Sequence, residues 1–333
     1  MGVRVREKPQ LVMKAKEKIT WIALLAVGVL IYGSHSILLN LCKVDGKIPF
    51  QSTSVVVMIE AVKLVLSLMM YFGATHQPPS PMLNQRSKDH QSWTWVNSLL
   101  YAMPAVLYGI NNNIIVHVPD HMDPASSQVL GNMKIVTTAV FYRLIFKKKF
   151  AWRQWFAVSL LAVAGMCYSG AEVQQSSTGS HNTREVFVTF TGILLMAVYC
   201  IVSGAAGITT EFILKWHSQS SLHLQNLHLY LYGVTFNLVA FYYSTWGSSE
   251  VRFFDGYSTW TFVIIISQAV IGLIMSVIMK HGSNILRLFV ISCAMVVNTV
   301  LSKLVFSLQP GIDFWLAFVL VLLALYLYYN QKS

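Results

Sequence analysis

The apolar residues of this chain gather into repeated runs of about 20 residues that carry almost no charge. A helix of that length crosses the ~30 Å hydrocarbon core of a bilayer. Of the 333 residues, 55% are hydrophobic and only 11% are charged, roughly half the charged share of a soluble domain. The pattern predicts an all-α polytopic membrane protein and excludes an ordinary cytosolic enzyme.

Ten transmembrane helices are predicted, and both tails therefore lie on one side of the membrane. The residues left over are too few for a separate soluble catalytic domain, so any function must lie between the helices. The approximate bounds of the spans are 19–41, 52–73, 95–117, 124–146, 152–170, 187–210, 223–246, 258–279, 285–306 and 312–329.

The distribution of basic residues predicts how the chain is oriented in the membrane. Of the 24 Lys and Arg residues, 17 fall on the side of the two tails, four on the other side and three within spans. Because cytosolic loops are enriched in Lys and Arg, both termini are expected in the cytosol. The formal net charge of +11 is mostly this orientation signal, so no nucleic-acid partner is needed to explain it.

The loops suggest two halves. We expect a basic cytosolic tail at 1–18, a first five-helix half at 19–170, a luminal linker at 171–186, a second half at 187–329 and a cytosolic C-terminus at 330–333. With an odd number of spans in each half, homologous halves insert with opposite orientation. Inverted repeats of this kind are common among secondary transporters.

Lys134 is the most informative charge, because it falls near the middle of the fourth span. An ammonium there costs ~2.5–3.5 kcal/mol on insertion scales and needs either a partner or a water-filled cavity. The same helix face carries Ser127, Gly131 and Thr138, which are all small or polar. We favour contact with water or an anionic substrate; the alternative is structural pairing with a distant carboxylate such as Glu60 or Glu211.

The other intramembrane charges have simpler explanations. Glu60 and Lys63 share one face of the second span and can neutralise each other, as either a structural or a gating ion pair. Glu211 and Lys215 are predicted to pair at the end of a helix, and Lys280 to lie at the membrane interface. Arg287, near the start of the ninth span, can extend its side chain to the interface.

Neutral polar faces point to a pocket between helices. The seventh span presents Asn226, Tyr230, Gly233 and Asn237 at helical spacing, and the third contains Tyr108 followed by residues 111–113, all Asn. Such groups either join helices or line a pocket for a base and ribose. Together with a midplane cation, they make an anionic nucleotide a reasonable ligand.

No catalytic or metal-binding motif accompanies these residues. The sequence lacks a phosphate-binding Gly-rich loop, a His-Glu-x-x-His site and a Gly-x-Ser-x-Gly elbow, and its four cysteines have no metal or disulfide spacing. We therefore expect no metal, no cofactor and no enzymatic activity.

Several motifs in combination resemble those of the nucleotide-sugar transporters of solute carrier family 35, subfamily A. The resemblance covers nearly the whole chain, although each motif alone is weakly specific. It rests on Glu60-x-x-Lys63, Tyr108-Gly-Ile-Asn-Asn-Asn113, the segment from Met122 to Lys134, Gln225-Asn-Leu-His-Leu-Tyr230, and Met279-Lys-His-Gly-Ser-Asn-Ile-Leu-Arg287.

The resemblance implies a Golgi antiporter of the drug/metabolite-transporter fold, which exchanges a cytosolic nucleotide sugar for a luminal nucleoside monophosphate. By motif position, Lys134 and Arg287 match family cations that meet the phosphate. The implied contacts to the rest of the nucleotide are Tyr108, Asn111, Asn112, Asn226 and Tyr230. The expected partners also include the lipid bilayer and further carrier chains, in a homo- or hetero-oligomer.

Three departures bear on the substrate. The CMP-sialic acid carriers have tyrosines where this chain has Ser127 and Gly131, and lysine where it has Arg287. Loss of two rings widens the pocket, so sialic acid specificity is not carried over. The departures favour a different sugar or alditol, and the resemblance to the subfamily implies a nucleotide-linked alditol such as CDP-ribitol, or otherwise a UDP-sugar. The alternative is a non-transporting scaffold or regulator that binds other carriers or glycosyltransferases.

Overall fold

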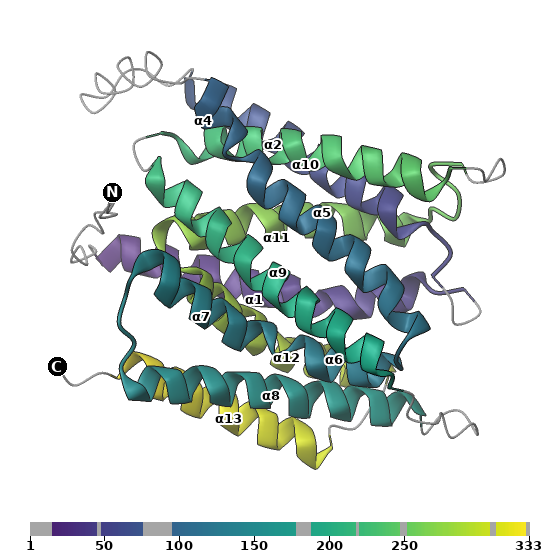
Figure 1. The fold of residues 1–333 in the computed structure, drawn as a ribbon, viewed down its shortest axis with the longest axis vertical. Coiled ribbons are helices and arrows are strands. Elements are labelled where there is room, and N and C mark those ends of the chain that lie inside the picture. Colours follow the sequence, from purple (N-terminus) through teal and green to yellow (C-terminus); the bar gives the residue numbers. More distant parts are fainter. Residues whose placement is uncertain are drawn as a thin grey trace. The chain divides into compact units, whose positions relative to one another are not determined.

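The computed structural model describes residues 15–44, 48–75, 95–177, 188–217, 220–246, 252–306 and 311–330 (Figure 1). Across these ranges the regular structure is helical, and Met122 and Val188 form an isolated strand-like bridge. Most of the expected basic tail, the loop 77–92 and residues 178–186 of the expected linker lie outside the described residues.

The helices follow the predicted spans closely. In chain order they are α1 (Ala15–Cys42), α2 (Ser52–Thr75), α4 (Trp95–Leu99), α5 (Ala102–His117), the short 3-10 helix η2 (Val118–Asp120), α6 (Pro124–Gly131), α7 (Lys134–Phe146), α8 (Trp152–Ser177), α9 (Phe190–Trp216), α10 (Leu222–Ser244), α11 (Thr259–His281), α12 (Asn284–Phe306) and α13 (Ile312–Tyr329).

Several helix starts follow from local chemistry. Ser221 accepts a hydrogen bond from the backbone N–H of Leu224 and caps α10, and Ser258 forms a reciprocal capping box with Thr261 at the start of α11. Asp123 caps α6 directly before a proline at the first helical position. These caps satisfy backbone donors that the helices cannot satisfy themselves.

Seven helical segments within the described ranges, one of them α6 and α7 taken together, are long and apolar enough to cross a membrane, which supports a polytopic membrane protein. The expected spans at 95–117, 152–170 and 223–246 coincide with helices that do not reach this threshold. One is interrupted, and the other two, α8 and α10, carry more polar side chains. The count of ten spans and their inverted arrangement therefore stay predictions.

Two expected spans are broken rather than continuous. The third consists of α4 and α5, separated by a turn at residues 100–101, and Pro104 in the first turn of α5 cannot donate to the preceding turn. The fourth consists of α6 and α7, separated at residues 132–133. There, Asn132 donates its side-chain amide to the Gln128 carbonyl and to the Ser169 hydroxyl of α8. An Asn that bonds in this way competes with regular helix geometry.

The chain forms two compact units, one from residues 1–109 and 209–283 (unit 1) and the other from residues 110–208 and 284–333 (unit 2). Each unit combines helices from both of the halves expected from the sequence. The proposed domain boundaries stay a prediction, although α8 continues to Ser177 and thus makes residues 171–177 of the expected linker helical.

Within unit 1, α2 packs along α10 and α1 packs along α11 (Figure 1). Cys42, Phe50 and Ile264 belong to one of its buried clusters, which joins the end of α1 to α2 and α11. Helices α2, α10 and α11 also contact one another, and this contact brings the charged residues of α2 against polar residues of the other two.

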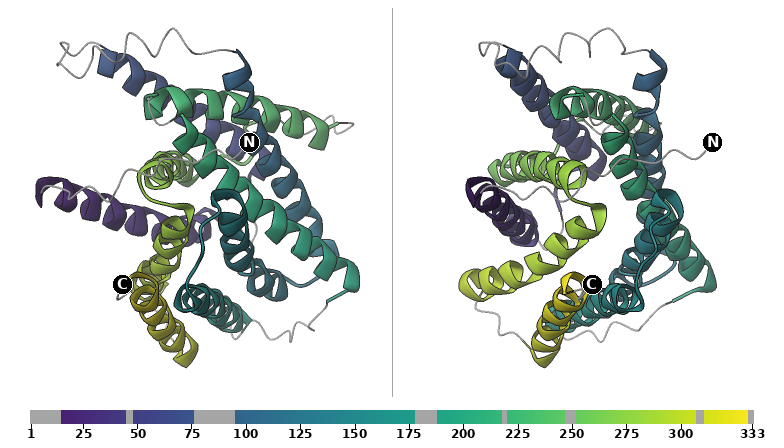
Figure 2. Two further views of the ribbon diagram at one scale, coloured as in Figure 1. Left: turned by 60° about the vertical axis from the view of Figure 1, so that its left-hand side comes forward. Right: turned by 90° about the vertical axis from the view of Figure 1, so that its left-hand side faces the viewer.

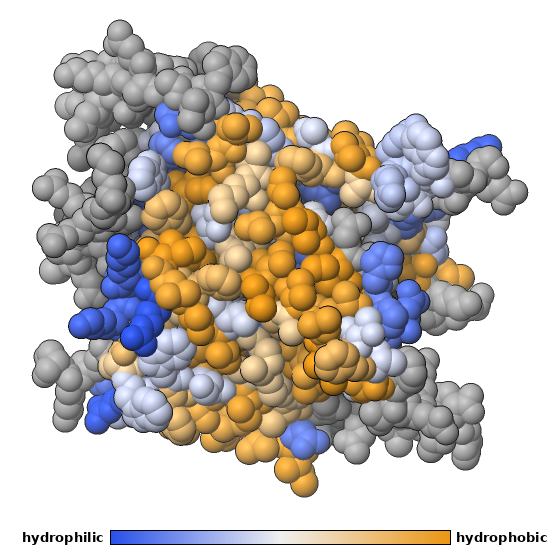
Figure 3. Space-filling model, in the orientation of Figure 1, coloured by the Kyte–Doolittle hydropathy of each residue, from blue (hydrophilic) through white to orange (hydrophobic). Residues whose placement is uncertain are grey.

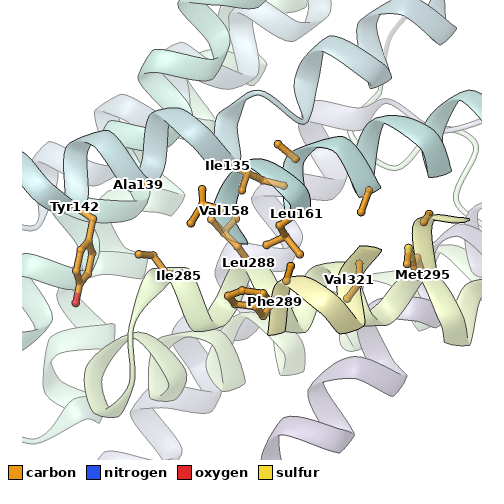
Figure 4. Packing of buried hydrophobic residues seen from close by; sticks show 14 of the residues in the cluster. Ile135, Ala139, Tyr142, Val158, Leu161, Ile285, Leu288, Phe289, Met295 and Val321 are labelled. Carbon is orange, nitrogen blue, oxygen red and sulfur yellow. The ribbon is translucent and has the colours of Figure 1, made fainter. Parts of the chain in front are cut away.

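Within unit 2, α8 and α13 lie side by side, and α6, α7 and α12 also pack against α8 (Figures 1 and 2). The largest buried cluster of the described residues lies here. Ile135 and Ala139 of α7, Leu161 of α8, and Ile285 and Phe289 of α12 all belong to it (Figure 4). Figure 3 shows that apolar residues cover most of one face of the molecule, as expected for a surface in contact with lipid.

Candidate functional site

Lys134 begins α7 and is half-buried. It is the ninth residue of the 21-residue candidate span Ser126–Phe146, so it lies near the middle, as predicted. Among the described residues, no carboxylate lies within ion-pair distance of its ammonium. Both acids considered as structural partners already have a lysine on their own helix, namely Lys63 for Glu60 and Lys215 for Glu211. The structural alternative therefore receives no support.

The break before Lys134 alters the helix face that the sequence predicted. Ser127 and Gly131 lie on α6, whereas Lys134 and Thr138 lie on α7, so the four residues do not share one continuous helix. The backbone bridges the break with short hydrogen bonds, such as those from Met133 to Leu130 and from Val136 to Met133. Gly131 is buried, with the methyl group of Met196 close by, and Ser127 is half-buried.

Arg287 lies in the first turn of α12 and is half-buried. Its guanidinium donates to the side-chain oxygen of Asn284 at 3.2 Å. Asn284 is itself buried against Gly207 of α9, where an added Cβ would lie 2.5 Å from the amide nitrogen. The glycine therefore makes room for the residue that orients the arginine, and sequence reasoning missed this arrangement because Gly207 and Asn284 are far apart in the chain.

Lys134 and Arg287 belong to neighbouring helices of one unit. Ile135 follows Lys134, Leu288 follows Arg287, and both of these apolar residues lie in the same cluster between α7 and α12 (Figure 4). Along their candidate spans the cations differ in depth, because Arg287 is the fourth residue of Asn284–Val305. Lys134 is therefore the cation nearer the middle of its candidate span, and Arg287 lies closer to the end of its own.

A second group of predicted residues meets within unit 1. The ammonium of Lys63 lies 2.5 Å from Oε1 of Glu60 and 4.6 Å from the ring centroid of Tyr230. The exposed fractions of the two charged side chains are 12% for Lys63 and 18% for Glu60. The hydroxyl of Tyr230 lies 3.0 Å from that of Ser276. Glu60 and Lys63 therefore form an ion pair with a cation–π contact from a different helix, and its structural or gating role stays a prediction.

Two glycines make room for this ion pair. A Cβ at Gly233 of α10 would lie 2.8 Å from Oε2 of Glu60, and one at Gly272 of α11 would lie 2.7 Å from the Lys63 side chain. A larger residue at either position would force a charged side chain to move. The close approach of helices at small residues is typical of membrane proteins. Here it places a charge pair among three helices.

The buried face of α10 is the one that the sequence predicted. Asn226, Tyr230 and Gly233 are all buried, and Asn226 is only 1% exposed. No described group hydrogen-bonds to its side-chain oxygen. Asn237, expected on the same face, donates instead to the Gly233 carbonyl of its own helix.

The residues of α5 have different environments. Tyr108 is half-buried and close enough to Tyr230 to interact with it electrostatically. Asn111 is 8% exposed, and its side-chain oxygen has no hydrogen-bond partner among the described residues, whereas Asn112 is exposed. Asn111 and Asn226 thus both keep an unused acceptor in a buried position.

A polar network joins the last turn of α9 to the end of α11. The ammonium of Lys215 lies 2.6 Å from Oε1 of Glu211 and also donates to the Gly282 carbonyl, and Lys280 donates to the Ser220 carbonyl at 2.7 Å. The pair predicted at this helix end is therefore present, and its carboxylate, Glu211, is fully buried. The i, i+4 spacing revealed the pair, but nothing in the sequence revealed its burial.

His217, directly after α9, belongs to the same region. Its Nδ1 lies 3.3 Å from the hydroxyl of Tyr101, and the two rings are stacked. Burial lowers the pKa of His217 below its usual 6.5; the charge of Lys280 acts in the same direction, and a backbone hydrogen bond at Ile213 opposes it.

The described residues contain no cluster of three or more His, Cys, Asp or Glu side chains that could hold a metal ion. Apart from the lysine-paired carboxylates Glu60 and Glu211 and the imidazole of His217, the polar side chains described above are cations, amides and hydroxyls. Cations and amide or hydroxyl groups can bind phosphate and sugar oxygens, and tyrosine rings can stack on bases. This combination is typical of a binding site for an anionic, hydroxyl-rich ligand.

A profile of the nucleotide-sugar transporter family matches residues 15–329, and the chain belongs to this family. The match confirms the resemblance seen in the motifs. By family, the protein is therefore a nucleotide-sugar transporter of a membrane.

Among curated proteins, the chain is similar to three vertebrate proteins, each named "Probable UDP-sugar transporter protein SLC35A4". The one from Xenopus tropicalis is 44% identical over 96% of this chain and 95% of its own. Those from Danio rerio and Homo sapiens are 42% and 38% identical, and each match covers 94% or more of both chains. Among solved structures, one crystal structure matches with a TM-score of 0.66 over 95% of this chain and 99% of its own, at 8% identity, which supports the fold alone.

Proposed function

We propose that this chain is a Golgi membrane antiporter, with both termini in the cytosol, that exchanges a cytosolic nucleotide-linked sugar or alditol for a luminal nucleoside monophosphate. Transport would proceed by alternating access. Of the three lysines that fall within predicted spans, Lys63 is paired with Glu60, and Lys303 is exposed near the end of its candidate span. Lys134 is half-buried near midspan without a carboxylate, and this observation carries the proposal.

Within this proposal, the two cations of unit 2 hold the phosphates. Lys134 supplies a compact charge at depth, and Arg287 supplies a planar fork that can bind two phosphate oxygens at once. Asn284 keeps that fork oriented through its hydrogen bond. Ser127 and Gly131, which replace aromatic residues of the sialic acid carriers, leave space for the sugar or alditol.

The base and ribose would meet the polar groups of α5 and α10. The unused acceptor atoms of Asn111 and Asn226 are available to a ligand, and Tyr108 and Tyr230 offer ring faces and hydroxyls. Asn112 is exposed and contributes from the surface of α5. The Glu60–Lys63 pair holds Tyr230 in place, either as a structural element or as a gate.

CDP-ribitol is the candidate cargo from the subfamily resemblance, whereas the names of the relatives point to UDP-sugars. Proteoliposomes preloaded with CMP or UMP can decide between them when they are offered labelled CDP-ribitol and a panel of UDP-sugars. Uptake that requires the matching monophosphate inside supports exchange. No uptake of any member of the panel, with any preload, would contradict the proposal.

The site is tested by Lys134→Ala against the matched control Lys303→Ala. Loss of a phosphate contact is expected to reduce uptake about tenfold or more, because a charge-assisted hydrogen bond contributes roughly 1.5–3 kcal/mol. The control removes the same charge from an exposed position. Equal uptake by both variants, at equal amounts of folded protein, would rule out the assigned site.

The alternative is a scaffold that binds other carriers or glycosyltransferases, which the substitutions at Ser127 and Gly131 would permit. Nucleotide ligands separate the two functions, because a bound ligand stabilises the folded protein by mass action. A rise in the midpoint of thermal unfolding with nucleotide diphosphate ligands, but not with nucleosides, supports a carrier. No rise with any nucleotide supports the scaffold.

A further inference from the structure

The turn between α7 and α8 carries the densest positive charge of the described chain. Five of the eleven residues from Arg143 to Arg153 are Lys or Arg. No Asp or Glu occurs in the sequence between Asp123 and Glu172. Four of the five are exposed, namely Arg143, Lys147, Lys149 and Arg153. A strongly hydrophilic patch marks the same turn in Figure 3, at the end of α7 seen in Figure 1.

The turn is held by an aromatic cluster. Phe150 stacks on Tyr142 with 5.6 Å between ring centroids and meets Trp155 edge-on at 5.5 Å. Lys147 ends α7 in a left-handed conformation with φ of 52°, and the Gln154 side chain accepts from the N–H of Ala151 where α8 begins. The basic side chains therefore project from a fixed backbone, which lowers the entropy that binding would cost.

The position of the turn relative to the membrane indicates what it binds. The candidate span Ser126–Phe146 ends one residue before Lys147, so the charges lie where hydrocarbon gives way to lipid headgroups. Trp152, at the start of α8, is 83% exposed, and an exposed Trp beside a basic cluster is typical of a membrane interface. The N-terminus of α8 adds its positive helix dipole next to Arg153.

We propose that this turn, Arg143 to Arg153, is a binding surface for the headgroups of acidic phospholipids in the cytosolic leaflet. Cations immediately next to a transmembrane helix are attracted to anionic lipid by about 1 kcal/mol each, or about fivefold in affinity per cation. The aromatic cluster holds them together, and Trp152 anchors them at the right depth. This surface is separate from the phosphate-binding cations Lys134 and Arg287 and does not depend on the transport proposal.

The test uses the full chain in neutral detergent, titrated with phosphatidylserine or phosphatidylcholine while the thermal unfolding midpoint is followed. The triple variant K147Q/K149Q/R153Q removes exposed charge from the turn. The control K43Q/R252Q removes exposed charge from the side predicted to face the lumen. Phosphatidylserine is expected to raise the midpoint of the wild type and of the control, whereas phosphatidylcholine is not.

For the triple variant, the phosphatidylserine concentration that gives half the effect should rise at least about tenfold, after allowance for screening by salt. The difference between the triple variant and the wild type should shrink in 0.5 M salt, where the electrostatic screening length is on the order of 4 Å. An unchanged titration of the triple variant, or an equal response to phosphatidylcholine, would overturn the proposal. So would an equal loss in the control, because the effect would then belong to net charge rather than to this turn.

Discussion

The ion pair between Glu60 and Lys63 should show an asymmetric response to mutation. Lys63→Met leaves the Glu60 carboxylate without its partner in a site where it is only 18% exposed, which costs about 3–5 kcal/mol for a buried pair. Glu60→Gln leaves the ammonium over the ring of Tyr230, and that contact retains about 1 kcal/mol of attraction. The double variant removes both charges, and its cost should fall well below that of either single variant.

Thermal unfolding of each purified variant in lipid nanodiscs measures this order. At about 2 °C per kcal/mol for a chain of this size, Lys63→Met should lower the midpoint by roughly 6–10 °C, Glu60→Gln by less, and the double variant least. A second cycle in a Tyr230→Leu background should bring the two single variants closer together. Additive losses in the double variant, or a larger loss for Glu60→Gln than for Lys63→Met, would refute the assignment of the pair and its aromatic partner.

Three further outcomes are expected. Gly207→Ala places a methyl group 2.5 Å from the amide nitrogen of Asn284, so it should disturb Arg287. About ten times more nucleotide should then be needed for the same rise in the thermal unfolding midpoint. Gly73→Ala, whose added methyl group meets nothing within 4 Å, is the control. Because burial lowers the pKa of His217 below 6.5, the unfolded chain binds more protons than the folded one. Stability should therefore fall as the pH drops below 6.5, and His217→Gln should flatten that slope in unfolding measured from pH 7.5 to 5.5. Gly256 has φ of +72° and faces a backbone carbonyl that a Cβ would approach to 1.9 Å, so Gly256→Ala should cost about 2 kcal/mol or more in the same assay; an unchanged midpoint would contradict that local backbone.

Charge and periodicity in the sequence were sufficient to predict local relations. The Glu60–Lys63 pair follows from a spacing of three on one helix, and the buried face of α10 follows from Asn226, Tyr230 and Gly233 at spacings of four and three. Both predictions use the geometry of a single helix. The position of Lys134 within its span followed in the same way from the length of an apolar run.

Relations between helices could not be predicted in this way. The break after Gly131 depends on Asn132 bonding to Ser169 of α8, and the position of Arg287 depends on Asn284 packing against Gly207 of α9. Neither contact leaves a periodic signal, because each depends on which helix is the neighbour. The roles of the predicted substrate-binding residues stay predictions for the same reason, since a ligand contact is also a relation between helices.

The contrast between Lys63 and Lys134 separates a charge used within the protein from one that we propose meets a ligand. Both lie within apolar spans, and each must offset an insertion cost of ~2.5–3.5 kcal/mol. Lys63 does so with a carboxylate and an aromatic ring, and two glycines leave the room for that arrangement. Lys134 has neither partner within the described residues, yet it is only partly buried. A cation of that kind is stable in a membrane when water or an anion reaches it, and in a nucleotide-sugar transporter the anion that must cross is the phosphate of the cargo.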